Sequence, residues 1–185
     1  MKRLTRIFTV LIIISVIVTS FGLANVDFSY AAAPKVTIKT TKVLADARVV
    51  NAYEELGFKT KVDKSLSYAG VFSVSKHAII VKSPKQEYVL HEMGHFFAEL
   101  TYSSDDAKEF IAIYIKEKNE YKGMLESYIR GSNKEYFAQS FAEYTMSPSK
   151  LKQSRPETYN YIKTKISSIS KVHIEDMQNS YGWAW

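Results

Sequence analysis

The chain has 185 residues, of which 46% are hydrophobic and 24% charged, with 7 Gly, 4 Pro and no Cys. These proportions exclude a collagen-like or flexible-linker chain, and the length is that of one domain with a single core. The formal net charge is +6, but no module that combines basic and aromatic residues is present, so we expect no nucleic-acid partner. Without cysteine, an exported chain must be stabilised by packing or by a bound metal.

The amino-terminal segment has the composition of a secretory signal peptide. Three basic residues are followed by an apolar run over 7–21 and then by a stretch of small residues. The run is short for a membrane-spanning helix, which needs about 20 residues, although a retained anchor is the alternative. We predict a signal peptide over 1–31, with cleavage after Ala24 as a second option, and a secreted, extracellular domain over 32–185. Its remaining formal charge of +4 is compatible with weak association with an anionic cell envelope, but lysines scattered among acids are more often simply solvated.

Hydrophobic periodicity divides the mature chain into a first part that forms strands and a second part that forms helices. Alternation predicts strands over 36–39, 58–62, 71–74 and 78–81, the last two forming a hairpin. A helical period covers 45–56, with Gly57 in the position of a C-terminal cap.

From residue 83 onward the pattern is helical. The segment 83–86 has the order Ser, Pro, Lys, Gln, which predicts a helix start with Ser83 as N-cap. Further helices are predicted with caps at 103–106, at Ser132 and at 154–157, whereas the tail from His173 shows no period. A small sheet followed by helices predicts a single α+β domain.

The segment His91-Glu92-Met93-Gly94-His95 is the most informative motif. Two histidines four apart on a helix point to one side and can share a metal ion. Glu92 lies further round the helix, where it can take a proton from a water molecule that zinc has activated. The alternative is that both histidines are structural. The predicted helix start upstream favours the zinc peptidase interpretation, in which Glu92 is the general base.

A catalytic zinc ion needs a third protein ligand and an open fourth position. No third histidine follows the motif at a suitable spacing, so the third ligand should be a carboxylate. Glu99 lies one turn further along the same helix and is carried away from the pair. Glu126, Glu135 and Glu143 lie on later segments that could fold back, and the spacing does not choose among them.

The segments 127–130 and 135–142, together with the motif at 91–95, resemble the anthrax lethal factor family of zinc peptidases, which includes small secreted Pro-Pro endopeptidases. The resemblance extends to about residue 169. It implies a zincin-like fold in which a small sheet lies beside the zinc-bearing helix and a mainly helical second half delivers the third ligand. It also implies an extended peptide or protein substrate that is cut at Pro-Pro bonds or at basic-then-apolar segments. We expect the protein to be a monomer.

By that resemblance, Zn²⁺ is bound by His91, His95 and Glu135, and Tyr128 donates a hydrogen bond to the oxyanion of the tetrahedral intermediate. The sequence departs from the family at Gln139, where a second glutamate is usual. That residue would orient a ligand, and an uncharged amide there would weaken metal binding or activity unless Glu143 compensates.

Two of these residues have structural alternatives. Ser132 and Glu135 also have the spacing of a capping box, in which the glutamate reaches back to the amide of the N-cap residue. Tyr128 could be a half-buried core aromatic. The function that competes with a zinc endopeptidase is a secreted binding protein or envelope-associated protein that keeps the peptidase scaffold without turnover, and Gln139 is its best support.

Overall fold

The structure, a computed structural model, describes residues 35–39 and 41–184, all within the unit Ala32–Trp185. The predicted signal peptide lies outside the described residues. The strands are β1 (Lys35–Ile38), β2 (Val43–Asp46), β3 (Lys59–Val62), β4 (Gly70–Ser73) and β5 (Ala78–Val81). The α-helices are α1 (Ala47–Glu55), α2 (Gln86–Leu100), α3 (Lys108–Glu117), α4 (Glu126–Gly131), α5 (Asn133–Met146), α6 (Pro148–Ser154), α7 (Pro156–Ser168) and α8 (Lys171–Tyr181). Two short 3₁₀ helices are η1 (Lys118–Glu120) and η2 (Gly182–Ala184). The mixed α+β architecture is as predicted.

The strands form two small sheets. β1 and β2 pair antiparallel, and the second sheet has the order β3-β5-β4, with β3 parallel and β4 antiparallel to β5. The predicted hairpin is therefore confirmed. Within the described part of the chain β4 pairs only with β5, so it forms one edge of its sheet.

The helix predicted from residue 45 begins two residues later. Ala45 and Asp46 belong to β2, and the Asp46 carboxylate accepts a hydrogen bond of 3.0 Å from the backbone N–H of Arg48, which caps α1. At the other end of the helix, Gly57 has φ of +80°, the left-handed conformation expected of a residue just past a helix.

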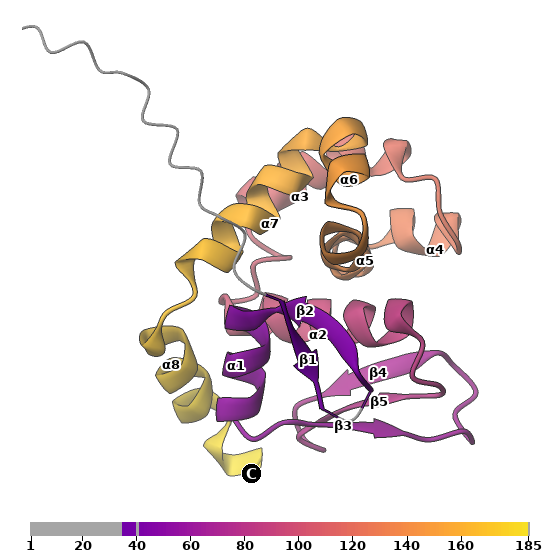
Figure 1. Ribbon diagram of the computed structural model, residues 1–185. Helices are drawn as coiled ribbons and strands as arrows, with labels where there is room; N and C mark the ends of the chain where they lie inside the picture. Colours follow the sequence, from indigo (N-terminus) through magenta and orange to yellow (C-terminus); the bar gives the residue numbers. More distant parts are fainter. Residues whose placement is uncertain (1–34, 40, 185) are drawn as a thin grey trace, which may run out of the picture. The chain divides into compact units, whose positions relative to one another are not determined.

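Helix α2 lies between the three-stranded sheet and α5 (Figure 1). Phe96 makes edge-to-face ring contacts with Tyr53 in α1, with Phe58 just before β3 and with Phe72 in β4. Phe97 packs on the rings of Phe137 and Phe141 in α5. Because α2 is apolar on both sides, it is fixed by contacts with the sheet and with the helical half together.

Two of the predicted helix starts are wrong. The backbone N–H of Lys82 still donates to the Ala69 carbonyl at 2.8 Å, which extends the sheet, so residues 83–85 are used for the turn and α2 begins at Gln86. Similarly, α3 begins at Lys108 with no capping side chain. The carboxylate of Asp106 instead forms an ion pair with Lys134 at 2.7 Å.

The tail that shows no period in the sequence is helical. Of the side chains in α8, only Met177 is fully buried, so the apolar pattern is too sparse to predict a helix. Hydrogen bonds attach α8 to the end of α2: the Tyr181 hydroxyl donates to Glu99, and the Tyr102 hydroxyl donates to Asp176 at 2.8 Å. Over residues 35–39 and 41–184, no helix has the length and apolar character needed to cross a membrane.

Candidate metal centre

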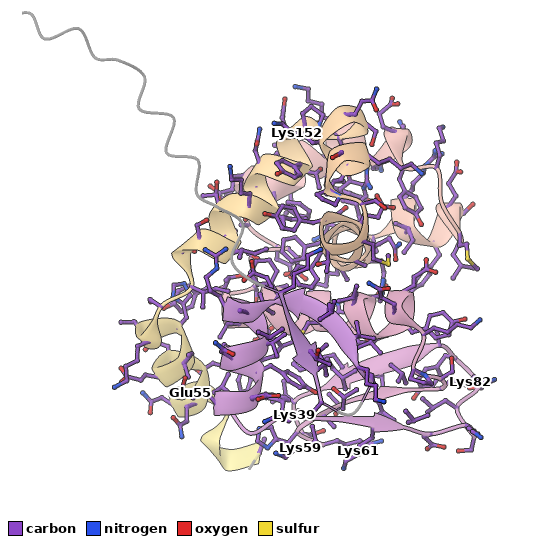
Figure 2. All side chains as sticks on the ribbon, in the orientation of Figure 1. Lys39, Glu55, Lys59, Lys61, Lys82 and Lys152 are labelled. Carbon is purple, nitrogen blue, oxygen red and sulfur yellow. The ribbon has the colours of Figure 1, made fainter. Side chains whose placement is uncertain are left out.

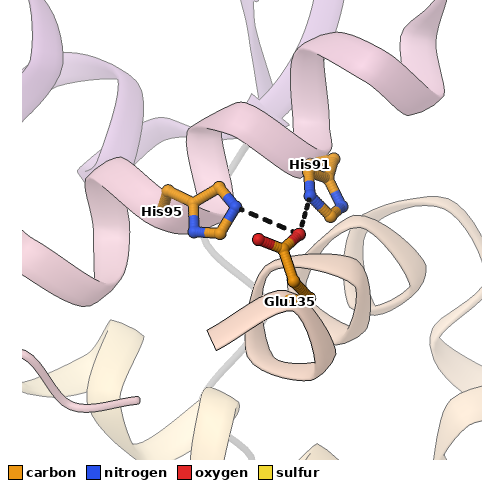
Figure 3. A group of neighbouring side chains, drawn as sticks. All are labelled: His91, His95 and Glu135. Atoms are coloured by element: carbon orange, nitrogen blue, oxygen red, sulfur yellow. Dashed lines mark hydrogen bonds and ion pairs between the residues drawn. The ribbon is translucent and has the colours of Figure 1, made fainter. Parts of the chain in front are cut away.

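His91, His95 and Glu135 meet at one point between α2 and α5 (Figure 3). A carboxylate oxygen of Glu135 lies 3.0 Å from Nε2 of His91 and 3.6 Å from Nε2 of His95. The two histidines come from adjacent turns of α2, and Glu135 comes from the first turn of α5. The structure thus brings together the three residues named as metal ligands, although 40 residues separate His95 from Glu135.

A close approach of the two helices makes this meeting possible. A Cβ atom added to Gly94 would lie 2.6 Å from Cα and 2.7 Å from the carbonyl oxygen of Ala138 in α5. No side chain fits in that space, so only glycine allows the backbones to lie this close. Gly94 stands between the two histidines, and Ala138 follows Glu135 by about one turn. The contact therefore sets the distance between the paired imidazoles and the carboxylate.

The donor set fits a zinc ion. Two imidazole nitrogens and one carboxylate oxygen are ligands typical of catalytic zinc sites. Zinc–ligand bonds of about 2.0–2.2 Å in a tetrahedron place neighbouring ligand atoms about 3.3–3.6 Å apart. The separations of 3.0 and 3.6 Å are close to that range, and the ligand atoms all lie within 4.8 Å of one another.

Gln139 contacts the other nitrogen of His91. The Nδ1–H group of His91 donates to Oε1 of Gln139 at 3.1 Å, which leaves Nε2 facing Glu135. Burial disfavours the charged form of His91, but the hydrogen bond with Glu135 and the charges of Glu92 and Glu135 prevail and raise its pKa. Burial favours the neutral form of Glu135 and by itself would raise its pKa. The hydrogen bonds and charges of His91 and His95 prevail and hold the pKa of Glu135 well below the ordinary value.

Glu92 lies beside the cluster without joining it. Its side chain is 6% exposed, and burial raises its pKa despite the nearby histidines and a hydrogen bond from the Phe72 backbone. A Cβ atom added to Gly70 would lie 2.9 Å from a Glu92 carboxylate oxygen, so the glycine makes room for this carboxylate at the edge strand. Glu92 is thus a buried base between β4 and the candidate metal centre.

Tyr128 in α4 lies beside the centre, next to Glu135. It is 57% exposed and lines two adjoining cavities together with His91 and Glu92. Partial burial and a hydrogen bond with Glu135 raise its pKa to about 12, so the phenol stays protonated at neutral pH. Its exposure shows that Tyr128 is not a core aromatic.

The remaining carboxylates considered as ligands are engaged elsewhere. Glu126 forms an ion pair with Arg130 at 2.6 Å. Glu143 pairs with Arg155, which is 1% exposed, and therefore does not compensate for Gln139 at the metal centre. Glu99 accepts a hydrogen bond from Tyr181. Glu143 turns toward Arg155 because a buried guanidinium charge needs a carboxylate partner.

The capping box is half formed. The Ser132 hydroxyl accepts a long hydrogen bond of 3.4 Å from the backbone N–H of Glu135, as a cap does. The Glu135 carboxylate faces the histidines, so the reciprocal hydrogen bond to the N-cap amide is replaced by contact with His91 and His95.

Two cavities adjoin the centre, one on each side. A largely apolar cavity of about 660 Å³ extends toward the start of α2, and a polar one of about 390 Å³ extends toward its end. The apolar walls include Tyr68, Tyr88, Met124, Leu125 and Ile129. These wall residues were not singled out from the sequence, because they come from separate loops and helices that meet only in the fold.

The fold and the residue cluster define an α+β domain with a candidate metal centre in a cleft. The chain belongs to the family described as anthrax toxin lethal factor, N- and C-terminal domain, whose model matches residues 35–165. Among solved structures, it is similar to the Pro-Pro endopeptidase PPEP-2 from Paenibacillus alvei, with 22% identity and a TM-score of 0.52 over 64% of this chain and 83% of that one. This likeness supports the fold. No curated protein matches the chain.

Proposed function

We propose that the chain is a secreted, zinc-dependent endopeptidase that prefers proline-containing substrates. The observation that carries the proposal is the meeting of His91, His95 and Glu135 beside the buried carboxylate of Glu92. The family and the solved Pro-Pro endopeptidase of similar fold support the same activity. The domain boundaries remain as proposed from the sequence, with a signal peptide over 1–31 and the catalytic domain over 32–185.

In this proposal His91, His95 and Glu135 hold the zinc ion. When bound, zinc polarises the substrate carbonyl and lowers the pKa of a water molecule to about 7. Glu92, buried beside the centre, then takes the proton of the attacking water as the general base. Glu92 later passes the proton to the leaving amine. The protonated phenol of Tyr128 donates a hydrogen bond to the oxyanion that develops on the carbonyl oxygen.

Strand β4 is the proposed docking edge for the substrate backbone. It lies at the sheet edge, and Gly70, Val71 and Phe72 line the polar cavity beside the centre. An extended peptide can add to such an edge through backbone hydrogen bonds. Because Pro removes a donor and restricts the backbone, Val71→Pro should raise KM or abolish cleavage. An unaltered KM would indicate a different docking strand.

The apolar cavity supports the preference for proline. Its walls include aromatic and aliphatic side chains at Tyr68, Tyr88, Met124 and Leu125, which suit the apolar ring of proline better than a charged side chain. The cavity shares His91, Glu92 and Tyr128 with the centre, so a side chain that fills it belongs to a residue close to the cleaved bond.

A screen of peptide libraries tests the activity and the preference together. The purified protein is given zinc and incubated with proline-containing and basic peptides, with Glu92→Ala as the blank. We expect cleavage of proline-containing peptides that disappears in the blank and after chelation of the metal. Cleavage of basic peptides alone would contradict the preference for proline. Intact peptides in both libraries would favour a binding protein that retains the scaffold.

A further inference from the structure

Basic residues are concentrated in the strand-forming part of the chain. Residues 35–85 contain nine lysines and one arginine against four acidic residues, a formal charge of +6. Residues 86–185 contain twelve basic and fourteen acidic residues, a formal charge of −2. The excess of positive charge in the described chain therefore lies in the part that forms the sheets.

The fold places three of these lysines on one surface. In the three-stranded sheet, Lys61 is opposite Ile80, which is opposite Val71. Alternation along β3 and just past the end of β5 adds Lys59 and Lys82 to the same surface, and this outer surface (Lys59, Lys61, Ile80 and Lys82) is called the lysine face below. Val71, at the β4 edge, lines the cleft and is not counted in it. The opposite face of the sheet carries the buried residues Thr60 and Ile79 and packs toward α2.

The charges of the lysine face are exposed and unpaired. Lys59, Lys61 and Lys82 are exposed, and within the described residues none of them has an ion-pair partner. In Figure 2 Lys59 and Lys61 project at the lower edge of the molecule and Lys82 at its right, whereas Lys152 lies at the top.

Most acids in the same part of the chain are already engaged. Asp46 pairs with Arg48 at 3.1 Å and Glu54 with Lys39 at 2.9 Å. The Asp63 carboxylate accepts two hydrogen bonds from Ser65, which lower its pKa and keep it ionised, so it offsets one positive charge at the end of β3. Glu55, the fourth acid, is the last residue of α1 and lies at the lower left of Figure 2, on the opposite side from Lys82. A positive potential therefore remains over the lysine face.

We propose that the lysine face binds a linear phosphodiester polymer that carries no bases, of the poly(glycerol phosphate) type. Alternate residues of a strand are about 6.6 Å apart, so Lys59 and Lys61 lie within one Debye length of each other and can engage successive charges of an extended polyanion. The face carries aliphatic side chains but no aromatic ones, so it offers nothing on which nucleic-acid bases could stack. Its apolar residue Ile80 is half-buried, so the face also lacks the exposed large apolar side chains that anchor a protein in a membrane surface.

Binding at this face would leave the candidate active site free. The cleft is formed by α2, α5 and the β4 edge, whereas the lysine face is the outer surface of the sheet. The enzyme could thus be retained on an anionic polymer while its cleft stays open to a peptide.

The experiment measures binding of the purified protein to immobilised poly(glycerol phosphate) over a range of salt concentrations. The variant Lys59→Gln/Lys61→Gln is compared with Lys150→Gln/Lys152→Gln, which removes the same charge from two exposed lysines around α6. We expect at least a tenfold loss of affinity at low salt for the first variant and less than twofold for the second. The slope of log K against log salt should fall by about 1.4 for the first variant only, since each phosphate contact contributes about 0.7.

Three results would overturn the proposal. One is equal loss in both variants, which would reflect net charge alone. Another is absence of polymer binding by the unmodified protein. The third is equal or tighter binding, through the same lysines, to oligothymidylate or to phosphatidylcholine vesicles with 30% phosphatidylglycerol. If the first variant does not fold, Lys59→Gln/Lys82→Gln replaces it with the same expectation. Cleavage of a soluble peptide should be unchanged in every variant, so failure here and failure of the proposed peptidase activity are separable.

Discussion

Gly94 in α2 lies against the backbone of Ala138 in α5, so closely that an added Cβ atom would be 2.6 Å from the Ala138 Cα. Glu135 and Gln139, which contact His91, lie on the same helix as Ala138. The separation of the two helices is therefore fixed by a residue that contributes no side chain to the centre.

We predict that Gly94→Ala separates the helices and weakens both the fold and metal binding. Overpacking typically costs about 1–3 kcal/mol, and the upper end is expected because the clash is with backbone. The control is Gly131→Ala at the end of α4, where an added Cβ meets nothing within 4 Å. Thermal melts and zinc titration provide the measurements. Equal stability and zinc affinity in the two variants would show that the helices adjust easily.

Tyr128→Phe should lower turnover by about 100-fold or more, because the hydrogen bond to the oxyanion is lost. Folding and zinc content should persist, since the side chain is largely exposed. The matched control is Tyr68→Phe, which removes the hydroxyl of another exposed tyrosine on the apolar cavity. Single-turnover kinetics on one peptide should separate the two variants, and similar rates for both would remove Tyr128 from the mechanism.

Glu135 and Ser132 are predicted to have separable roles. Glu135→Ala should nearly abolish tight zinc binding, because it removes the third ligand. Ser132→Ala should instead cost about 1 kcal/mol of stability with zinc retained, the usual effect of losing an N-cap. Zinc content by atomic absorption, together with denaturant unfolding, measures both effects. Tight zinc binding by Glu135→Ala would mean that another group completes the site.

The sequence was sufficient to identify the parts of the fold and of the site that depend on local spacing. The histidine pair follows from helical periodicity, and Gly57 follows from the conformation of helix ends. What could not be predicted depends on contacts between distant residues. Glu143 has the spacing to support the site, but it is drawn to the buried charge of Arg155. Helix α8 has too few apolar residues to show a period and is attached by polar contacts such as that between Tyr181 and Glu99.

Gln139→Leu should weaken zinc affinity by 10- to 100-fold, the usual effect of removing a partner that orients a ligand. The Leu side chain cannot accept the hydrogen bond from Nδ1–H of His91, so the ring loses its orientation. Gln139→Glu keeps an acceptor and adds negative charge, so its affinity should equal or exceed that of the unmodified protein. Equal affinities for all three proteins would show that His91 is oriented by its packing alone.

The pH dependence of stability should have opposite signs with and without zinc. In the metal-free protein the pKa of His91 is raised above its ordinary value of 6.5, mainly by Glu135 acting against burial. The protonated ring therefore stabilises the fold fully below pH 6.5, and this contribution is lost as the pH rises through the folded-state pKa. Zinc requires neutral imidazoles, so its stabilising effect grows over the same interval.

We therefore expect the difference in melting temperature between zinc-loaded and chelated protein to widen from pH 6 to pH 8. Thermal melts in matched buffers, with saturating zinc or with excess chelator, measure that difference. Glu135→Ala serves as the control, because a protein without the third ligand should show little zinc-dependent shift at any of these pH values. A difference that is independent of pH in the unmodified protein would contradict competition between protons and zinc at His91, and with it the assignment of His91 as a ligand.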